Sequence, residues 1–137
     1  MKSFETLPLY PSELALLCQS IAIVIETAPV AELRDLLIEL RVPAIAVVDA
    51  ERSLCGVVTR TDVLRGLADP DATARDVMSG FVFALPVDSS IECAAALMAI
   101  EGVGQVVVTA HDGALLGMVS ALDIARHLAV RAGYLAA

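Results

Sequence analysis

The residues best suited to chemistry in this chain occur twice, in the stretches GVVTRTDVLRGL and GMVSALDIARHL. In each stretch a hydroxyl residue stands three positions before an aspartate, which gives the pairs Thr59/Asp62 and Ser120/Asp123. An apolar strand pattern precedes each pair and an apolar helical pattern follows it, so amides, a hydroxyl and a carboxylate meet at one helix N-terminus. Free amides at such an end favour an anion such as phosphate, and a carboxylate accepts two hydrogen bonds from a vicinal diol. A ribose phosphate satisfies both groups.

The same spacing has a purely structural interpretation. A serine or threonine followed three residues later by an acidic residue is a capping box, which begins a helix and needs no ligand. The recurrence of the pair after the same glycine and apolar residues favours a nucleoside site, because many residue pairs can make a cap. Arg60, directly after Thr59, can reach a phosphate, or it can be an exposed ion-pair partner of Asp62. Ala121 follows Ser120, so of two unequal clefts the one with Arg60 is the better site for a phosphorylated ligand.

An internal repeat determines the architecture. When the sequence is shifted by 61 residues, it matches itself without a gap from Val30/Ile91 to Leu67/Leu128. Each repeat predicts the order strand, helix, strand, strand, helix. The predicted elements are strands over 21–26 and 81–85, a helix over 30–40 and its repeat, strands over 44–49 and 105–110, and third strands that end at Thr59 and Ser120. Ser89 and Glu92 stand at capping-box spacing before the second repeat's first helix. Residues 69–80 form the connection, with a short turn of helix.

Composition narrows the range of partners. The 137 residues are 58% hydrophobic and 4% aromatic, with no tryptophan, which is typical of strands covered by helices. A chain of this size cannot bury so much apolar surface by itself, so we expect an oligomer. The net charge of −8 leaves no basic stripe for a nucleic acid and disfavours an anionic membrane. No apolar run approaches the ~18 residues of a membrane span, and the N-terminus does not resemble a signal peptide.

Cysteines and reactive side chains point away from catalysis. Cys18, Cys55 and Cys93 are widely spaced among apolar neighbours, which predicts buried free thiols in a reducing cytoplasm. The sequence offers no serine-histidine-aspartate set and no cluster of metal ligands. We therefore expect a non-enzyme that requires no cofactor.

The repeated pattern of glycine, two apolar residues, a hydroxyl residue and an aspartate at a helix start, with RDVMS leading into the second copy, resembles the cystathionine-β-synthase (CBS) domain. Two copies in tandem resemble a Bateman module, and the resemblance covers roughly residues 18 to 132. It implies an α/β (α+β) fold of two CBS repeats, with boundaries here at 1–68 and 69–137. A pseudo-twofold axis would relate the repeats across a shared cleft. Before the first repeat the chain reads YPSELALLCQS, which shares no motif with RDVMS.

What the resemblance implies about ligands can be assigned to positions in this chain. Thr59 with Asp62, and Ser120 with Asp123, would meet the phosphate and ribose of an adenosine ligand. Backbone and small apolar groups would hold the adenine where the middle strand begins and at the start of the first strand. The residues are Val42, Pro43 and Ala44, Val103, Gly104 and Gln105, and the strand starts near Ile21 and Val82. The ligand would be AMP, ADP, ATP, S-adenosylmethionine, NAD or a dinucleotide. The family also implies a homodimer in which paired helices form a flat disc of four repeats.

Three functional classes follow from these observations. The leading hypothesis is a non-catalytic module that binds an adenosine-containing ligand between its repeats and signals to a protein partner. The alternative is an oligomeric interaction or scaffold module whose clefts have lost binding. A nucleotide hydrolase or transferase would need a divalent metal site, which the sequence does not offer.

Overall fold

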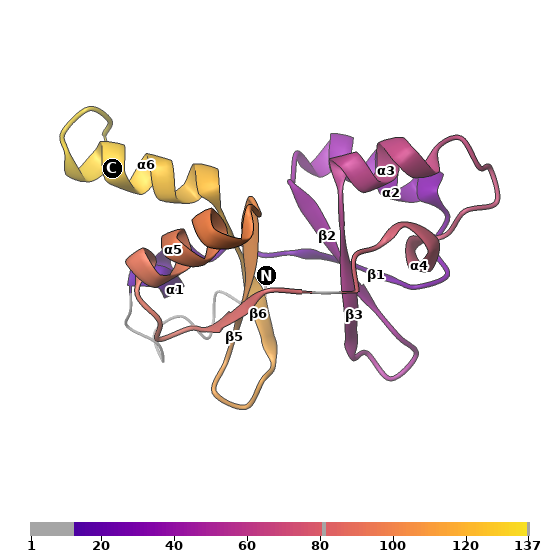
Figure 1. Cartoon of the computed structure of the whole chain (residues 1–137), viewed down its shortest axis with the longest axis horizontal. Helices are drawn as coiled ribbons and strands as arrows, with labels where there is room; N and C mark the ends of the chain where they lie inside the picture. The colour runs from indigo at the N-terminus through magenta and orange to yellow at the C-terminus, as the bar shows by residue number, and fades with distance from the viewer. Residues whose placement is uncertain (1–12, 81, 137) are drawn as a thin grey trace. The chain divides into compact units, whose positions relative to one another are not determined.

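The computed structural model describes residues 13–80 and 82–136, and these form two compact units of mixed α and β structure. The first-repeat unit comprises residues 21–82. The second-repeat unit comprises residues 83–136 together with residues 13–20. Each unit contains one three-stranded sheet and the helices that pack against it (Figure 1).

The first-repeat unit follows the element order that the repeat predicts. Its elements are β1 (Ala22–Ile25), α2 (Val30–Leu40), β2 (Ala44–Val48), β3 (Leu54–Thr59), α3 (Arg60–Gly66) and α4 (Ala74–Val77). β2 is central, with β1 parallel to it on one side and β3 antiparallel on the other. The helix α2 crosses over between the parallel strands, and it lies beside α3 (Figure 1).

The second-repeat unit repeats this topology. Its elements are α1 (Glu13–Leu17), β4 (Ala84–Pro86), α5 (Ile91–Glu101), β5 (Gln105–Thr109), β6 (Leu115–Ser120) and α6 (Ala121–Arg131). β5 is central, parallel to β4 and antiparallel to β6. The predicted strand over 81–85 is displaced, since β4 spans Ala84–Pro86 and Phe81 lies outside the described residues.

Aliphatic side chains form both cores. In the first-repeat unit, Leu33 and Leu37 of α2 pack with Val47 and Val58 of the sheet. All five residues of β2 are buried, as a continuous apolar run predicts for a central strand. In the second-repeat unit the equivalent strand residues Val108 and Val119 are fully buried. The side chains named in this core carry no polar atoms, so close packing and apolar burial hold each sheet to its helices.

The segment that leads into each repeat packs on the third strand of the other repeat. Ser79, just before the second repeat, pairs with Val57 of β3 through backbone hydrogen bonds of 3.0 and 3.1 Å. Gln19, just before the first repeat, pairs with Met118 of β6 at 2.8 and 2.9 Å. No motif before the first repeat predicts a counterpart of RDVMS. The structure corrects this, because Cys18 and Gln19 take the place in one unit that Met78 and Ser79 take in the other.

This exchange explains the two repeated glycines. A Cβ on Gly56 would collide with the carbonyl oxygen of Ser79, and a Cβ on Gly117 would collide with that of Gln19. Each glycine therefore lets a lead-in segment approach the third strand closely.

Two further predictions are corrected. The helix α5 begins after Ser90, whose hydroxyl accepts a hydrogen bond from the Cys93 amide at 3.0 Å, so the predicted capping box of Ser89 and Glu92 is wrong. All three thiols are free, but only Cys18 is buried. Cys93 lies on the outer face of α5 and is exposed, and Cys55 is half-buried.

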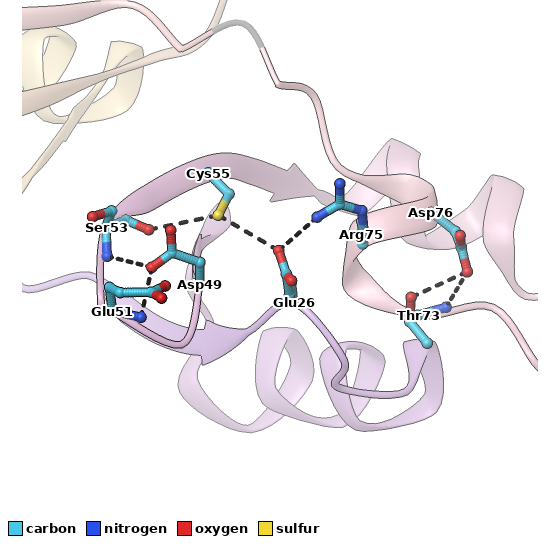
Figure 2. Close-up of polar contacts among 8 residues, drawn as sticks. All are labelled: Glu26, Asp49, Glu51, Ser53, Cys55, Thr73, Arg75 and Asp76. Carbon is cyan, nitrogen blue, oxygen red and sulfur yellow. Dashed lines mark hydrogen bonds and ion pairs between the residues drawn. The ribbon is translucent and has the colours of Figure 1, made fainter.

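A polar cluster holds α4 to the sheet of the first-repeat unit (Figure 2). Arg75 donates to the Glu26 carboxylate at 2.8 Å, and the Cys55 thiol donates to the same oxygen at 3.7 Å. Loss of water contact and the carboxylates of Asp49 and Glu26 raise the pKa of Cys55. The thiol is therefore neutral near pH 7 and acts as a weak donor.

Candidate functional site

Thr59 and Asp62 form a reciprocal cap at the start of α3. Oδ2 of Asp62 accepts from the Thr59 amide at 2.8 Å and from its hydroxyl at 3.0 Å, and the Asp62 amide donates back to Oγ1 at 3.4 Å. Oδ1 lies 3.9 Å from a guanidinium nitrogen of Arg65, so that residue, and not Arg60, is the ion-pair partner. The Asp62 side chain is 15% exposed.

Ser120 and Asp123 form the equivalent cap at the start of α6. The Ser120 amide donates to Oδ2 of Asp123 at 2.8 Å, and the Asp123 amide donates to Oγ of Ser120 at 3.1 Å. The two sites thus share one arrangement, in which one carboxylate oxygen is used by the helix start and the other can accept from a ligand.

A third box shows what this arrangement does by itself. Thr73 and Asp76 make the same bonds at the start of α4, with 2.9 Å from the Thr73 amide and 3.1 Å from its hydroxyl (Figure 2). This pair does not follow a strand of either sheet. The cap alone therefore carries no information about ligands, and the neighbouring strand positions must distinguish a binding site from a helix start.

The strand register brings the predicted adenine contacts beside both caps. Ala44, the first residue of β2, is opposite Thr59, the last residue of β3. Ile21 precedes β1, whose first residue Ala22 pairs with Ile45, so it belongs to the same sheet edge. Val42 and Pro43 lead into that edge and are half-buried. The first predicted set is therefore assembled within one unit.

In the second-repeat unit Gln105 is opposite Ser120, and the Ala121 amide donates to the Gly104 carbonyl at 2.8 Å. Val103 immediately precedes them. Val82 lies one residue before Phe83, whose carbonyl oxygen accepts a hydrogen bond from the Val107 amide of β5 at 2.9 Å.

A groove between α2 and α3 was not predicted from the sequence. Arg34, Leu37, Ile38 and Arg41 line it from the α2 side, and Arg60, Val63, Leu64 and Leu67 line it from α3, around about 680 Å³. Arg60 thus belongs to the groove as well as to the first turn after Thr59. The available signal was the repeat itself, because Arg34 and Arg41 occupy positions where the second repeat has Ala95 and Gly102.

A buried thiol lies close to the second cap. Burial raises the pKa of Cys18 from 9.0 to about 11, with a smaller rise from the Asp123 carboxylate and an opposing hydrogen bond from Met118. A nucleophilic cysteine needs a lowered pKa, so this one has the opposite character. Among the described residues, no cluster of three or more histidine, cysteine or acidic side chains could hold a metal ion. Nor does any helix in that part of the chain have the length and apolarity to cross a bilayer.

A model of one family matches both repeats of the chain. The model, described as the CBS domain, matches residues 16–69 and 74–130. A search of curated protein sequences found no match.

Solved structures share this fold. The CBS domain pair of protein MJ0100, in complex with 5′-methylthioadenosine and S-adenosyl-L-methionine, has a TM-score of 0.75 at 22% identity, over 84% of this chain and 94% of that one. CBSX2 in complex with AMP has a TM-score of 0.69 at 22% identity, over 79% and 87%. The cytosolic domain of the Mg²⁺ channel MgtE in complex with ATP has a TM-score of 0.76 at 26% identity, over 92% of this chain and 53% of that one.

Proposed function

Because the chain belongs to the CBS domain family, as the match over both repeats shows, we propose that it is a non-catalytic regulatory module for an adenosine-containing ligand. The ligand binds between the two repeats, and its presence is passed to a protein partner in the cytoplasm. One observation carries this proposal. In each unit, the residues before and at the start of the central strand lie beside the hydroxyl and aspartate at the end of the third strand.

The chemistry of this sheet edge fits a nucleoside. Half-buried apolar groups such as Val42 and Pro43 suit an adenine face, and the backbone around them suits its polar edge. The second carboxylate oxygens of Asp62 and Asp123 accept from the ribose hydroxyls. Arg60, at the first position of α3, supplies a cation for a phosphate, which Ala121 cannot do.

Solved relatives of this fold support the ligand class. The three complexes above contain S-adenosyl-L-methionine with 5′-methylthioadenosine, AMP, and ATP. For this chain we propose AMP, ADP, ATP, S-adenosylmethionine or NAD, with phosphorylated ligands favoured at the site that includes Arg60.

We also propose that two copies pair through their helices. Large apolar side chains are exposed on the helices of both units, and they include Ile38, Leu64, Ile100, Leu122 and Leu128. Scattered exposed leucines are normal, but several on paired helices mark an interaction surface.

The decisive experiment replaces each aspartate by asparagine. Asn caps a helix as well as Asp does, but it removes a charged acceptor whose hydrogen bonds are worth ~1.5–3 kcal/mol. Asp62→Asn and Asp123→Asn should each lower affinity by roughly ten- to a hundredfold in calorimetric titration with AMP and adenosine, with little change in melting temperature. Arg60→Ala should weaken AMP but not adenosine.

The third cap provides a matched control. Asp76→Asn makes the same chemical change in the same kind of cap away from either sheet edge, so it should leave affinity unchanged. If all three variants behave alike, the aspartates serve only as caps.

The scaffold hypothesis has its own support, because the caps are complete without any ligand. A thermal-shift panel of adenosine ligands separates the two functions. A melting temperature that no ligand raises at millimolar concentration would favour the scaffold.

A further inference from the structure

One end of the groove between α2 and α3 lies beside the candidate ligand edge of the first-repeat unit. Arg41 follows the last residue of α2 and Arg60 is the first residue of α3, and both line the groove. Ala44, which begins β2 soon after Arg41, is opposite Thr59, the residue before Arg60. The two guanidinium groups therefore belong to the same end of the groove, next to the residues proposed to hold an adenosine ligand.

Both arginines are available to bind an anion. Both residues are exposed, and within residues 13–80 and 82–136 neither guanidinium group has a hydrogen bond or an ion pair. The carboxylate of Asp62 at this edge has Arg65 as its ion-pair partner, at 3.9 Å. An anion that binds between two such cations also offsets their mutual repulsion.

Arg41 occupies a backbone position that suits glycine. Its φ is 54°, in the left-handed region, and the equivalent residue of the second repeat is Gly102, with φ 68°. A residue with a Cβ is disfavoured in this region. Arg52 shares the conformation, but it lies in the turn between β2 and β3, at the far end of β2 from Arg41. Only Arg41 combines the disfavoured conformation with a place at the ligand edge, which indicates that its side chain has a function there.

The second repeat has neither cation. Gly102 and Ala121 stand where the first repeat has Arg41 and Arg60, and Glu101 precedes Gly102. The reciprocal cap is nevertheless the same in both repeats. The two sheet edges thus share a frame and differ in charge, and this difference favours ligands of different charge.

We propose that the first site selects an adenosine ligand with at least two phosphates, such as ADP or ATP, and that Arg41 recognises the second phosphate. This rests on the proposed function and names the ligand of one of its two sites. Arg60, directly after Thr59, binds the phosphate next to the ribose, and Arg41 binds the phosphate beyond it. A guanidinium group forms paired, charge-assisted hydrogen bonds with phosphate oxygens, so each phosphate adds a specific contact. The second site does not distinguish AMP from ADP.

Calorimetric titration with adenosine, AMP and ADP tests this proposal. The protein carries Asp123→Asn, which weakens the second site, and the buffer contains EDTA, so that no divalent cation neutralises the phosphates. We expect ADP to bind about tenfold more tightly than AMP. Arg41→Gly should abolish this preference and leave the affinities for AMP and adenosine unchanged, whereas Arg60→Ala should weaken both nucleotides. If ADP binds no more tightly than AMP, the proposal is wrong and the proposed function still stands.

Two variants control for effects that need no contact with the second phosphate. Arg34→Ala removes a cation from the same groove about 10 Å along α2 from Arg41. It therefore measures general electrostatic attraction and any effect on the pairing of copies. Arg52→Gly relieves the same backbone conformation away from the groove. Both variants should keep the preference for ADP, and a loss in either of them as large as in Arg41→Gly would overturn the proposal.

The second site allows a gain of function. Gly102→Arg with Ala121→Arg copies both cations into an Asp62→Asn protein, whose first site is weakened. A Cβ at Gly102 meets nothing within 4 Å, so the backbone there has room for the arginine. The altered site should bind ADP about tenfold more tightly than AMP, and equal affinities would contradict the role of the arginine pair. Failure of the wild-type protein to bind adenosine, AMP and ADP would overturn the proposed function as well, whereas binding without a preference overturns only this inference.

Discussion

The two repeats have the same frame and different surfaces. Strand order, register, the glycine that admits the lead-in segment and the cap at the second helix are the same in both units. The lining of the helix groove differs. Arg34, Ile38 and Arg60 of the first repeat correspond to Ala95, Ala99 and Ala121 of the second, and the groove falls from about 680 to about 280 Å³. What both repeats retain serves folding and the candidate ligand edge, and we expect what differs to serve the proposed pairing of copies.

The retained glycines should give the largest effect. Gly56→Ala and Gly117→Ala each bring a Cβ onto a backbone carbonyl, which cannot move without breaking the pairing with the lead-in segment. Overpacking of this kind costs roughly 1–3 kcal/mol and occasionally more, so we expect about 3 kcal/mol from urea unfolding for both. Gly80→Ala is the control, because a Cβ there meets nothing within 4 Å. If Gly80→Ala lowers the free energy of unfolding as much as Gly56→Ala does, contact with the lead-in segments does not explain the effect.

The lead-in segments themselves differ in how they titrate. Cys18 occupies in one unit the place that Met78 occupies in the other, and only the cysteine can lose a proton. Because burial raises its pKa from 9.0 to about 11, the thiol favours the folded state fully below pH 9, and this contribution is lost as the pH rises through about 11. At 1.36 kcal/mol per unit, the loss approaches ~3 kcal/mol.

The Cys18→Met variant, which copies the other unit, isolates this effect. The difference between wild-type and variant unfolding free energies should be constant from pH 7 to 8.5 and fall between pH 9 and 11. A difference that does not change with pH would show that the thiol titrates alike in both states.

The shared frame could be predicted from the sequence because each part leaves a local signal. The structure confirms two equivalent sheets, as the 61-residue repeat predicts, each with a continuous apolar strand at its centre. It also confirms the capping boxes of Thr59/Asp62 and Ser120/Asp123. The exchange of lead-in segments left none, because its contacts are between backbones, and the helices α1 and α4 share no motif. Gly56 and Gly117 are the sequence signal of this exchange, but their role cannot be interpreted until the segment that packs on them is known. The predicted cap was Ser89 and the observed cap is Ser90. Both serines lie near the helix start, and the conformation of the preceding turn determines which of them caps the helix.

The groove could not be predicted for a different reason. An arginine on a helix is usually a solvated residue, and sequence alone does not say which second helix its face meets. The pairing of Ala44 with Thr59 brings Arg41 and Arg60 to the same end of the groove. This pairing is a tertiary contact, which local sequence patterns do not reveal. Alignment of the two repeats shows arginines at positions where the second repeat has alanines and a glycine, but it does not show that these arginines line one groove.

The smallest predicted effect separates strain from function at the left-handed positions. At two equivalent left-handed positions the first repeat has arginine, Arg41 and Arg52, where the second has Gly102 and Gly113. Relieving the left-handed strain is worth about 1–2 kcal/mol, offset in part by the flexibility of glycine in the unfolded chain at about 0.5–1 kcal/mol. Arg41→Gly and Arg52→Gly should therefore each stabilise the separated copies by about 0.5–1 kcal/mol, measured by urea unfolding at concentrations below the dimer dissociation constant.

Dimerisation should distinguish the two variants, because only Arg41 lines the groove. Arg41→Gly should weaken dimerisation severalfold and Arg52→Gly should not. Equal effects on dimerisation would show that Arg41, like Arg52, simply closes a turn, and that the arginines of the groove do not act together.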